Sequence, residues 1–351
     1  MRSDAFIARL GIAYPIIQGP MGGGPSTPEL TAAVCNAGAL GSLGAAYGSP
    51  QRIATDIKET KSRTARPFNV NLFVSTAPGP CVDPQPMLSR LTVIHESLGI
   101  PPPLLPAPPS DPFPEQLNAV LADKPAVFSF TFGIPGAEGL ARLKASGVYV
   151  IGTATTTEEA VWLERAGVDA VVAQGEEAGA HRGTFRGTFE ASMVPLETLL
   201  ATTLKAVDIP VIAAGGLMDG AGIARVLGVG AAAAQLGTAF LPCPESGASP
   251  AYKEAVLGAR ADTTVVTRVF SGRPARGLRN AFVDALEGCL ATVLPYPLQN
   301  ALTRAMRDAA ARLGDARYLS LWAGQGVAHA RQMPAAQLVR TLVDEMKAAR
   351  P

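Results

Sequence analysis

Short apolar runs alternate with longer amphipathic segments along most of the chain. Eight of these runs are too short for core helices, and they are continuous in apolar residues rather than alternating with polar ones. We predict that they are β-strands, at residues 14–21, 39–45, 68–74, 126–133, 149–155, 169–175, 209–217 and 231–241. Such runs are typical of a parallel sheet that is covered on both faces.

One segment of helical periodicity separates most neighbouring runs. The clearest follows the first run, where Ser26 or Thr27 can cap the N-terminus of a helix that Gly38 ends. Further helices are predicted at 49–61, before Gly147, at 156–167, around 195–206 and up to Gly228. Eight strand and helix repeats predict an α/β protein, a closed (β/α)8 TIM barrel rather than an open sheet.

Two segments do not fit this alternation. Residues 75–114 contain twelve prolines, which predicts an irregular insertion after the third strand, with one short helix at 87–99. From residue 243 to 351 the pattern is mostly helical. We therefore predict two domains, a barrel at 1–242 and a smaller C-terminal helical lid at 243–351 that packs on it.

Composition limits the partners. The 30 Lys and Arg residues nearly balance the 29 Asp and Glu residues, so no overall field favours nucleic acid or an anionic membrane. The chain has no signal-peptide core and no run of about 18 apolar residues. We expect a cytoplasmic protein that acts on a small molecule and binds neither nucleic acid nor membrane, and the sequence predicts no oligomeric state.

The four cysteines are far apart and show no metal-binding spacing, so we expect no metal site. The candidate chemistry lies instead at the carboxyl ends of the predicted strands, where the active sites of such barrels are found. Residues there are small or carry amides, and few are charged. This composition suits a large planar ligand that is held by backbone contacts and amide hydrogen bonds.

Two glycine-containing turns could hold a phosphate group. Gly215 and Gly216 follow the seventh strand, and Gly237 and Thr238 follow the eighth. Loops at these two positions form a recurrent phosphate site in this fold, because glycine permits close backbone approach. The alternative is that these glycines only end strands. The glycines at 22–24 lack the spacing of a dinucleotide fingerprint.

His181 follows the sixth strand within the run QGEEAGAHRG and is one of only three histidines. It is the only candidate general acid or base near neutral pH among the residues at the strand ends. The alternative is a packing or surface histidine. Glu176 and Glu177 could orient His181 or be solvated loop carboxylates, and we expect the latter. We expect Arg182 to anchor the loop rather than to act chemically.

Several runs together resemble a known family. PIIQGPM, RPFNVNLF, AQGEEAGAHRG, PVIAAGGLMDG and AAAAQLGTAFL, in this order and spacing, resemble the nitronate monooxygenases, formerly called 2-nitropropane dioxygenases. SGRPARGLRN and YPLQNALT resemble the C-terminal part of the bacterial class I enzymes. The likeness runs from about residue 10 to residue 310. Ala180 departs from it, since family members often have glycine there.

The resemblance implies a barrel with a helical lid and non-covalently bound FMN. His181 matches the family's catalytic histidine, and Tyr296 is a candidate for the substrate pocket. The residues that the likeness places around the flavin are Pro20, Met21, Asn71, Thr153, Gln174 and Gly179 near the ring and ribityl chain, and Gly215, Gly216, Gln235, Gly237 and Thr238 near the phosphate.

The implied reaction oxidises an alkyl nitronate with dioxygen to a carbonyl compound and nitrite. His181 would remove the α-proton of a neutral nitroalkane, or offer positive charge or a hydrogen bond to a nitronate. The nearest alternatives are an NAD(P)H:quinone reductase or a flavin-dependent enoyl-acyl-carrier-protein reductase on the same barrel. A barrel that binds phosphorylated ligands without redox chemistry is an alternative of another class.

Overall fold

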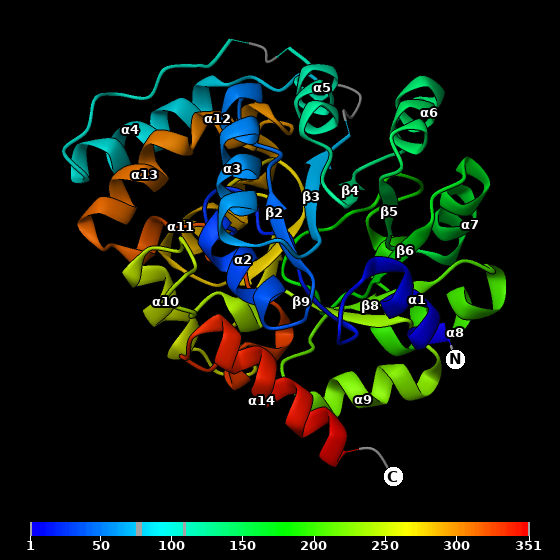
Figure 1. The fold of residues 1–351 in the computed structure, drawn as a ribbon. Helices are drawn as coiled ribbons and strands as arrows, with labels where there is room; N and C mark the ends of the chain where they lie inside the picture. Colours follow the sequence, from blue (N-terminus) through cyan, green and yellow to red (C-terminus); the bar gives the residue numbers. More distant parts are fainter. Residues whose placement is uncertain (1, 75–78, 108–109, 350–351) are drawn as a thin grey trace.

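The computed structural model describes residues 2–74, 79–107 and 110–349. Eight parallel strands form one sheet in the order β1-β9-β8-β6-β5-β4-β3-β2. Ile17 of β1 pairs with Leu40, next to β2, and this parallel bridge closes the sheet into a barrel (Figure 1). The predicted barrel is confirmed. Its strands are β1 (Ile16–Gln18), β2 (Gly41–Gly44), β3 (Phe68–Phe73), β4 (Val127–Thr131), β5 (Tyr149–Ala154), β6 (Ala170–Gln174), β8 (Val211–Ala214) and β9 (Ala233–Leu236).

Helices surround the barrel. Thr27, rather than Ser26, caps the first of them by accepting a hydrogen bond from the Leu30 N–H. Seven helices each follow a barrel strand, namely α2 (Pro28–Asn36), α3 (Pro50–Arg63), α5 (Phe113–Asp123), α6 (Ala137–Ala145), α7 (Thr157–Ala166), α8 (Leu196–Ala206) and α9 (Gly220–Val229). The ring is completed by α14 (Ala335–Ala348), which packs against α9 and α2 (Figure 1).

The barrel interior is apolar at one end and polar at the other. Helix α1 (Arg2–Leu10), which was not among the predicted elements, packs Phe6 against Tyr149 at the start of β5. Asn69 and Asn71 of β3 instead point inward, where the Nδ2 atoms of both donate to the Ser129 hydroxyl at 2.9 Å. The polar end is the carboxyl end of the strands, where a ligand can be held.

The proline-rich insertion contributes to a second apolar core. Its helix α4 (Gln85–Ser97) lies close to the predicted 87–99, while residues 75–78 and 108–109 of the insertion lie outside the described residues. Met87 and Leu91 of α4 pack with Phe282 and Met306 from the C-terminal region. The helices of that region are α10 (Pro250–Leu257), α11 (Ala281–Leu286), α12 (Leu298–Leu302) and α13 (Arg304–Leu313), with short 3-10 segments at Glu287–Thr292, Ala316–Tyr318 and Gln325–His329.

The C-terminal region also contains strands that the sequence pattern did not predict. A hairpin of β10 (Thr264–Thr267) and β11 (Ala275–Leu278) pairs with a short strand, β7 (Ala180–His181), from the loop after β6. The β-branched run TVVT favours a strand, but each element is too short for its periodicity to stand out. His181 therefore pairs with Ala275 of the C-terminal region.

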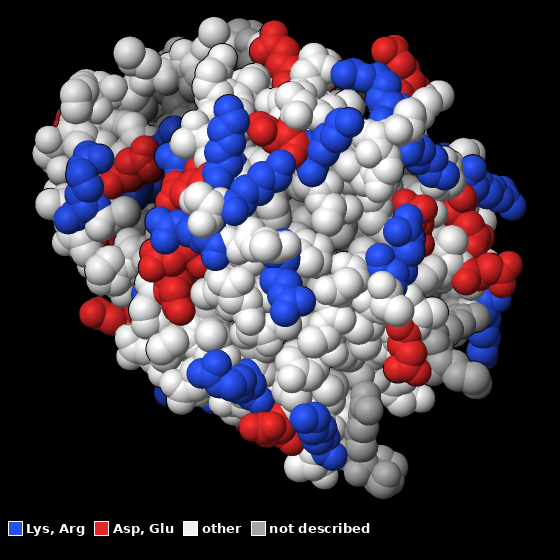
Figure 2. Space-filling view, viewed as in Figure 1, with Lys and Arg blue, Asp and Glu red and all other residues white. Residues whose placement is uncertain are grey.

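The molecular surface is of mixed charge. On the face shown in Figure 2, basic and acidic side chains are interspersed rather than gathered by sign. Among the described helices, none combines the length and the apolar character that crossing a bilayer requires.

Candidate active site

A cavity of about 370 Å³ opens at the carboxyl ends of the barrel strands. This volume lies within the range of about 300–1,000 Å³ that is typical of small-molecule and cofactor sites. Nearly all the predicted site residues line it, namely Pro20, Met21, Asn71, Thr153, Gln174, Gly179, His181, Gly215, Gly216, Gln235, Gly237 and Thr238. Residues that are distant in sequence thus form one continuous wall.

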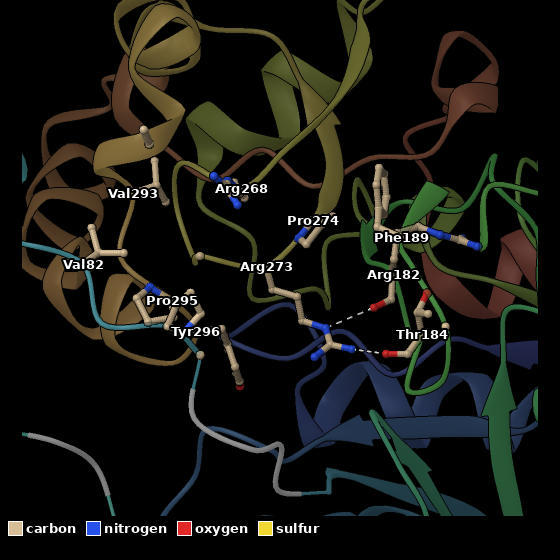
Figure 3. Close-up of a pocket in the computed structure, with 15 residues that line it drawn as sticks. Val82, Arg182, Thr184, Phe189, Arg268, Arg273, Pro274, Val293, Pro295 and Tyr296 are labelled. Carbon is tan, nitrogen blue, oxygen red and sulfur yellow. Dashed lines mark hydrogen bonds between the residues drawn. The ribbon is translucent and has the colours of Figure 1, made fainter. Parts of the chain in front are cut away.

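Tyr296 lines an adjoining cavity of about 380 Å³ rather than the central one. Its ring nevertheless lies 5.9 Å from the imidazole of His181 and 5.8 Å from the ring of Phe132. Tyr296 and Arg273 both line the adjoining cavity (Figure 3). The Tyr296 side chain therefore lies between the two cavities.

The turns after β8 and β9 are open to a ligand. Gly215 and Gly216 have φ angles of 137° and 67°, which glycine adopts without strain. A methyl group added at Gly237 would meet no atom within 4 Å. Within the described chain, the backbone N–H groups of Gly216, Gly237 and Thr238 donate no hydrogen bond. These free donors fit an anionic group such as a phosphate.

The amide of Gln174 holds the loop that carries His181. Its Nε2 donates to the carbonyl of His181 at 3.0 Å, and its Oε1 accepts from the N–H of Gly183 at 2.8 Å. The Gln174 side chain can still contact a ligand, but its amide nitrogen and oxygen both form hydrogen bonds that position the loop.

Two buried ionic side chains secure the same loop. The Arg182 guanidinium donates to the carbonyl oxygens of Gly175, Gln174 and Ser192, as expected of a loop anchor. The Glu159 carboxylate accepts from the N–H groups of Phe185 and Arg186. Both residues are at most 1% exposed, so these bonds fix the chain on the far side of His181.

Glu177, expected to be a solvated loop carboxylate, is half-buried and bonds to the backbone. Both of its carboxylate oxygens accept from the N–H of Leu196, at 3.0 Å, near the start of α8. The N-terminus of a helix carries partial positive charge and free donors, which favour a carboxylate there. Glu177 is therefore a structural acceptor in the turn before His181.

His181 is buried among aromatic rings. The rings of Phe73, Phe132, Tyr296 and Trp322 have centroids 5.5–6.3 Å from its own. Its Nε2 lies 2.8 Å from the Ser271 hydroxyl oxygen. Its Nδ1 has no hydrogen-bond partner in the described chain, and the side chain lines the cavity.

Positive charge surrounds His181. Burial, followed by the nearby charges of Arg273 and Arg307, lowers the pKa of His181 to about 3, so its imidazole is neutral near pH 7. Among the described residues, neither guanidinium forms a salt bridge. Arg273 donates to the carbonyls of Arg182 and Thr184 (Figure 3), and Arg307 donates to the backbone and side-chain oxygens of Asn300.

Two residues of the cavity wall adopt left-handed backbone conformations although they are not glycine. Phe132 has a φ of 78° and Ala180 a φ of 64°. Such conformations store strain, and they concentrate at functional sites. The glycine that the resemblance implies at position 180 would adopt this conformation without strain.

Several residues at the site were not predicted. Ser271, Arg273 and Arg307 lie close to His181, although they follow it by many positions in the chain. Gly324 donates to the Thr238 hydroxyl at 2.9 Å and so packs the C-terminal region onto the turn after β9. The run AGQG at 323–326 was the available signal for this contact. The described ranges contain no group of three or more His, Cys, Asp or Glu side chains that could hold a metal ion.

Comparisons with known proteins agree with this geometry. A family model described as nitronate monooxygenase matches residues 3–345. Curated nitronate monooxygenases from Pseudomonas aeruginosa and Paraburkholderia phytofirmans are each 44% identical over 98% of this chain, covering 99% and 95% of their own lengths. The crystal structure of a nitroalkane oxidase from Streptomyces ansochromogenes superposes with a TM-score of 0.91 at 42% identity, covering 98% of both chains. FabK from Thermotoga maritima has a TM-score of 0.77 at 29% identity and covers 98% of this chain and 96% of its own.

Proposed function

Since the chain belongs to the nitronate monooxygenase family of oxidoreductases, whose members are generally flavin-dependent, we propose that its central cavity binds FMN. In this site the enzyme oxidises alkyl nitronates with dioxygen to carbonyl compounds and nitrite. FMN bound in this cavity would supply the redox chemistry of the reaction. The protein binds, orients and shields the reactants.

The residues around the cavity fit FMN. The free N–H groups of Gly216, Gly237 and Thr238 would hold the phosphate, with Gly215 and Gln235 nearby. Pro20, Met21, Asn71, Thr153, Gln174 and Gly179 would border the ring system and ribityl chain. The open space at Gly237 supports this assignment, because a phosphate needs close approach to the backbone.

The observation that carries the substrate assignment is the positive charge beside His181, where the carboxylates of Glu159 and Asp308 act on Arg273 and Arg307 without forming a salt bridge to them. Arg273 and Arg307 both influence the imidazole, and among the described residues neither is paired with a carboxylate. Cations held in a buried site attract an anion more strongly than they would in water. A nitronate is such an anion, and the nitrite product is another.

His181 is the proposed catalytic residue. Because its pKa is lowered to about 3, the imidazole stays neutral over the physiological pH range and keeps a lone pair available. It can accept the α-proton of a neutral nitroalkane, while the arginines stabilise the nitronate that forms. Tyr296 and Trp322, whose rings lie within 6 Å of the imidazole, would exclude water from the reacting atoms.

The test is the visible spectrum of the purified protein, followed by oxygen consumption and nitrite release with ethyl nitronate. We expect bound FMN that bleaches on anaerobic addition of the nitronate, and nitrite formed under air. Rapid reduction by NADH or NADPH, with no nitrite from the nitronate, would indicate the reductase alternative. A colourless protein that takes up no FMN would favour the non-redox barrel.

A further inference from the structure

The hydroxyl of Ser271 forms a buried hydrogen-bond chain with His181. Ser271 is 1% exposed, and its Oγ lies 2.8 Å from the imidazole Nε2. The same Oγ donates to the carbonyl of Arg273 at 3.1 Å and accepts from the Arg273 N–H at 3.3 Å. The hydroxyl therefore has three partners, of which only the Arg273 carbonyl and His181 Nε2 could accept its single proton.

The number of available protons decides the direction of this chain. A serine hydroxyl has a single proton to donate. If that proton goes to the Arg273 carbonyl, the short contact to His181 requires the proton to be on Nε2. The reverse arrangement, with Ser271 donating to Nε2, leaves the Arg273 carbonyl without its donor. The first arrangement satisfies every group.

The surroundings fix the serine in place. Gly272 has a φ of 83°, and a methyl group there would lie 2.3 Å from the carbonyl oxygen of Leu294. The segment that carries Ser271 is thus packed tightly against the segment that leads to Tyr296. On the other side, Ala275 of β11 pairs with His181 of β7. This pairing keeps the two residues at a constant separation.

We propose that Ser271 is a positioning residue whose hydroxyl oxygen accepts a hydrogen bond from the Nε2–H of His181 and thereby directs the bare Nδ1 into the cavity. The hydrogen bond made by one ring nitrogen sets which nitrogen remains free for chemistry. When Nδ1 takes a proton from substrate, Ser271 keeps its bond to Nε2 and stabilises the imidazolium. The stabilisation of the imidazolium rests on the proposed function, whereas the assignment of the proton to Nε2 does not.

The direct test is ¹⁵N NMR of the FMN-loaded holoenzyme labelled at histidine. Only three histidines contribute, and the signals of His181 are those lost in His181→Asn. We expect a protonated Nε2 and a bare Nδ1 in the wild type. In Ser271→Ala we expect signals that are averaged between the two tautomers. A wild-type His181 with its proton on Nδ1 would overturn the proposal.

Kinetics provide a second test that separates positioning from general damage. Ser271→Ala should lower kcat/KM for nitroethane by about tenfold or more, because the bond to the charged imidazolium is lost. For ethyl nitronate, which needs no proton removed from carbon, the change should stay within about threefold. Ser271→Thr keeps the hydroxyl and should restore the rate with nitroethane. Equal losses on both substrates would contradict the positioning role.

The control is Ser192→Ala, which removes another buried hydroxyl that donates to a backbone carbonyl, that of Phe189 at 2.7 Å. This variant should leave the His181 signals unchanged. The NMR result also separates the two proposals. A protonated Nε2 in a protein that yields no nitrite would leave the role of Ser271 standing while the proposed function fails.

Discussion

The guanidinium of Arg273 lies over the ring of Phe132, with 3.8 Å between its Cζ and the ring centroid. Phe132 is one of the strained residues of the cavity wall, and its ring is 5.8 Å from that of His181. A cation stacked on an aromatic face is held there by the ring's quadrupole. The stack therefore fixes a positive charge in the wall beside His181.

Replacing Arg273 by glutamine should change both the charge at the site and its substrate preference. We expect the pKa of His181 to rise, because one of the two charges that lower it is removed. We also expect kcat/KM for ethyl nitronate to fall by about tenfold, as the loss of roughly 1.4 kcal/mol of attraction implies. NMR titration of His181 and steady-state assays measure these two effects.

Arg66→Gln is the matched control, because Arg66 is exposed just before β3, at the opposite end of the barrel. It removes the same charge from the molecule without touching the cavity. An equal loss of kcat/KM in both variants would mean that overall charge, rather than Arg273, attracts the nitronate.

His181→Asn should keep FMN bound and reduce activity on neutral nitroalkanes by roughly a hundredfold or more, the usual scale for a general base.

The same variant tests the lowered pKa of His181 through its effect on stability. His181 has a pKa of about 3 in the folded protein, below the unfolded value of about 6.5. Its contribution to stability is thus present above about pH 6.5 and is lost as the pH falls towards 3.

Denaturant unfolding at several pH values measures this contribution. Between pH 6.5 and 4 the wild type should lose up to about 1.4 kcal/mol per pH unit more than His181→Asn. Parallel stability curves for the two proteins would show that His181 titrates normally in the folded state.

Gly237→Ala tests the phosphate assignment. The structure leaves open space where the new methyl group would lie, and the backbone of Gly237 has a negative φ of −102°. The apoprotein should therefore fold as well as the wild type. If the space belongs to a phosphate, the affinity for FMN should fall by about tenfold or more, as measured by fluorescence titration.

Gly228→Ala is its control, since Gly228 also has open space but lies in helix α9. Alanine should stabilise that helix by up to about 1 kcal/mol and leave FMN binding unchanged. Wild-type FMN affinity in Gly237→Ala would place the phosphate elsewhere.

Ala180→Gly should relieve local strain. The left-handed conformation costs an alanine about 1–2 kcal/mol, and the greater chain entropy of unfolded glycine offsets about 0.5–1 kcal/mol of that gain. We expect a net stabilisation of about 1 kcal/mol or less, measured as an increase in the urea midpoint. Ala180 also lines the cavity, so kcat/KM for a bulkier nitronate such as that of 2-nitropropane should rise. A lower urea midpoint would contradict the assigned strain.

Glu159→Gln should destabilise the protein by about 1–3 kcal/mol, because a neutral amide cannot accept from all the donors that now meet the carboxylate. These donors include the Thr155 hydroxyl and N–H, both at 2.7 Å, and the loop N–H of Arg186 at 2.8 Å. Urea unfolding measures the loss. The neighbouring Glu158→Gln, at an exposed pair with Arg186, should change stability by less than about 0.5 kcal/mol.

The barrel could be predicted because its signal is local. Each strand is a short apolar run, and capping residues such as Thr27 and Ser49 mark the helix starts within a few positions. The glycines after β8 and β9 and the loop of His181 were found for the same reason. They directly follow strands whose carboxyl ends meet at one face of the barrel.

The rest of the site depends on contacts between distant segments. Ser271 approaches His181 only because β11 pairs with β7, and a two-residue strand leaves no periodicity to detect. Arg307 comes from the first turn of α13, where it reads as an ordinary polar position of an amphipathic helix. Only the structure shows that Arg307 lines the cavity together with Tyr47 and that the two groups interact electrostatically.

The position of α14 has a consequence for biosynthesis. This helix fills the gap in the ring between α9 and α2, yet in the described sequence it comes after all the other elements. The surfaces of α9 and α2 that α14 covers therefore stay exposed on a nascent polypeptide until residues 335–348 have left the ribosome. Premature termination anywhere before residue 335 leaves apolar strand and helix surfaces uncovered, and such fragments are natural substrates for chaperones and proteases.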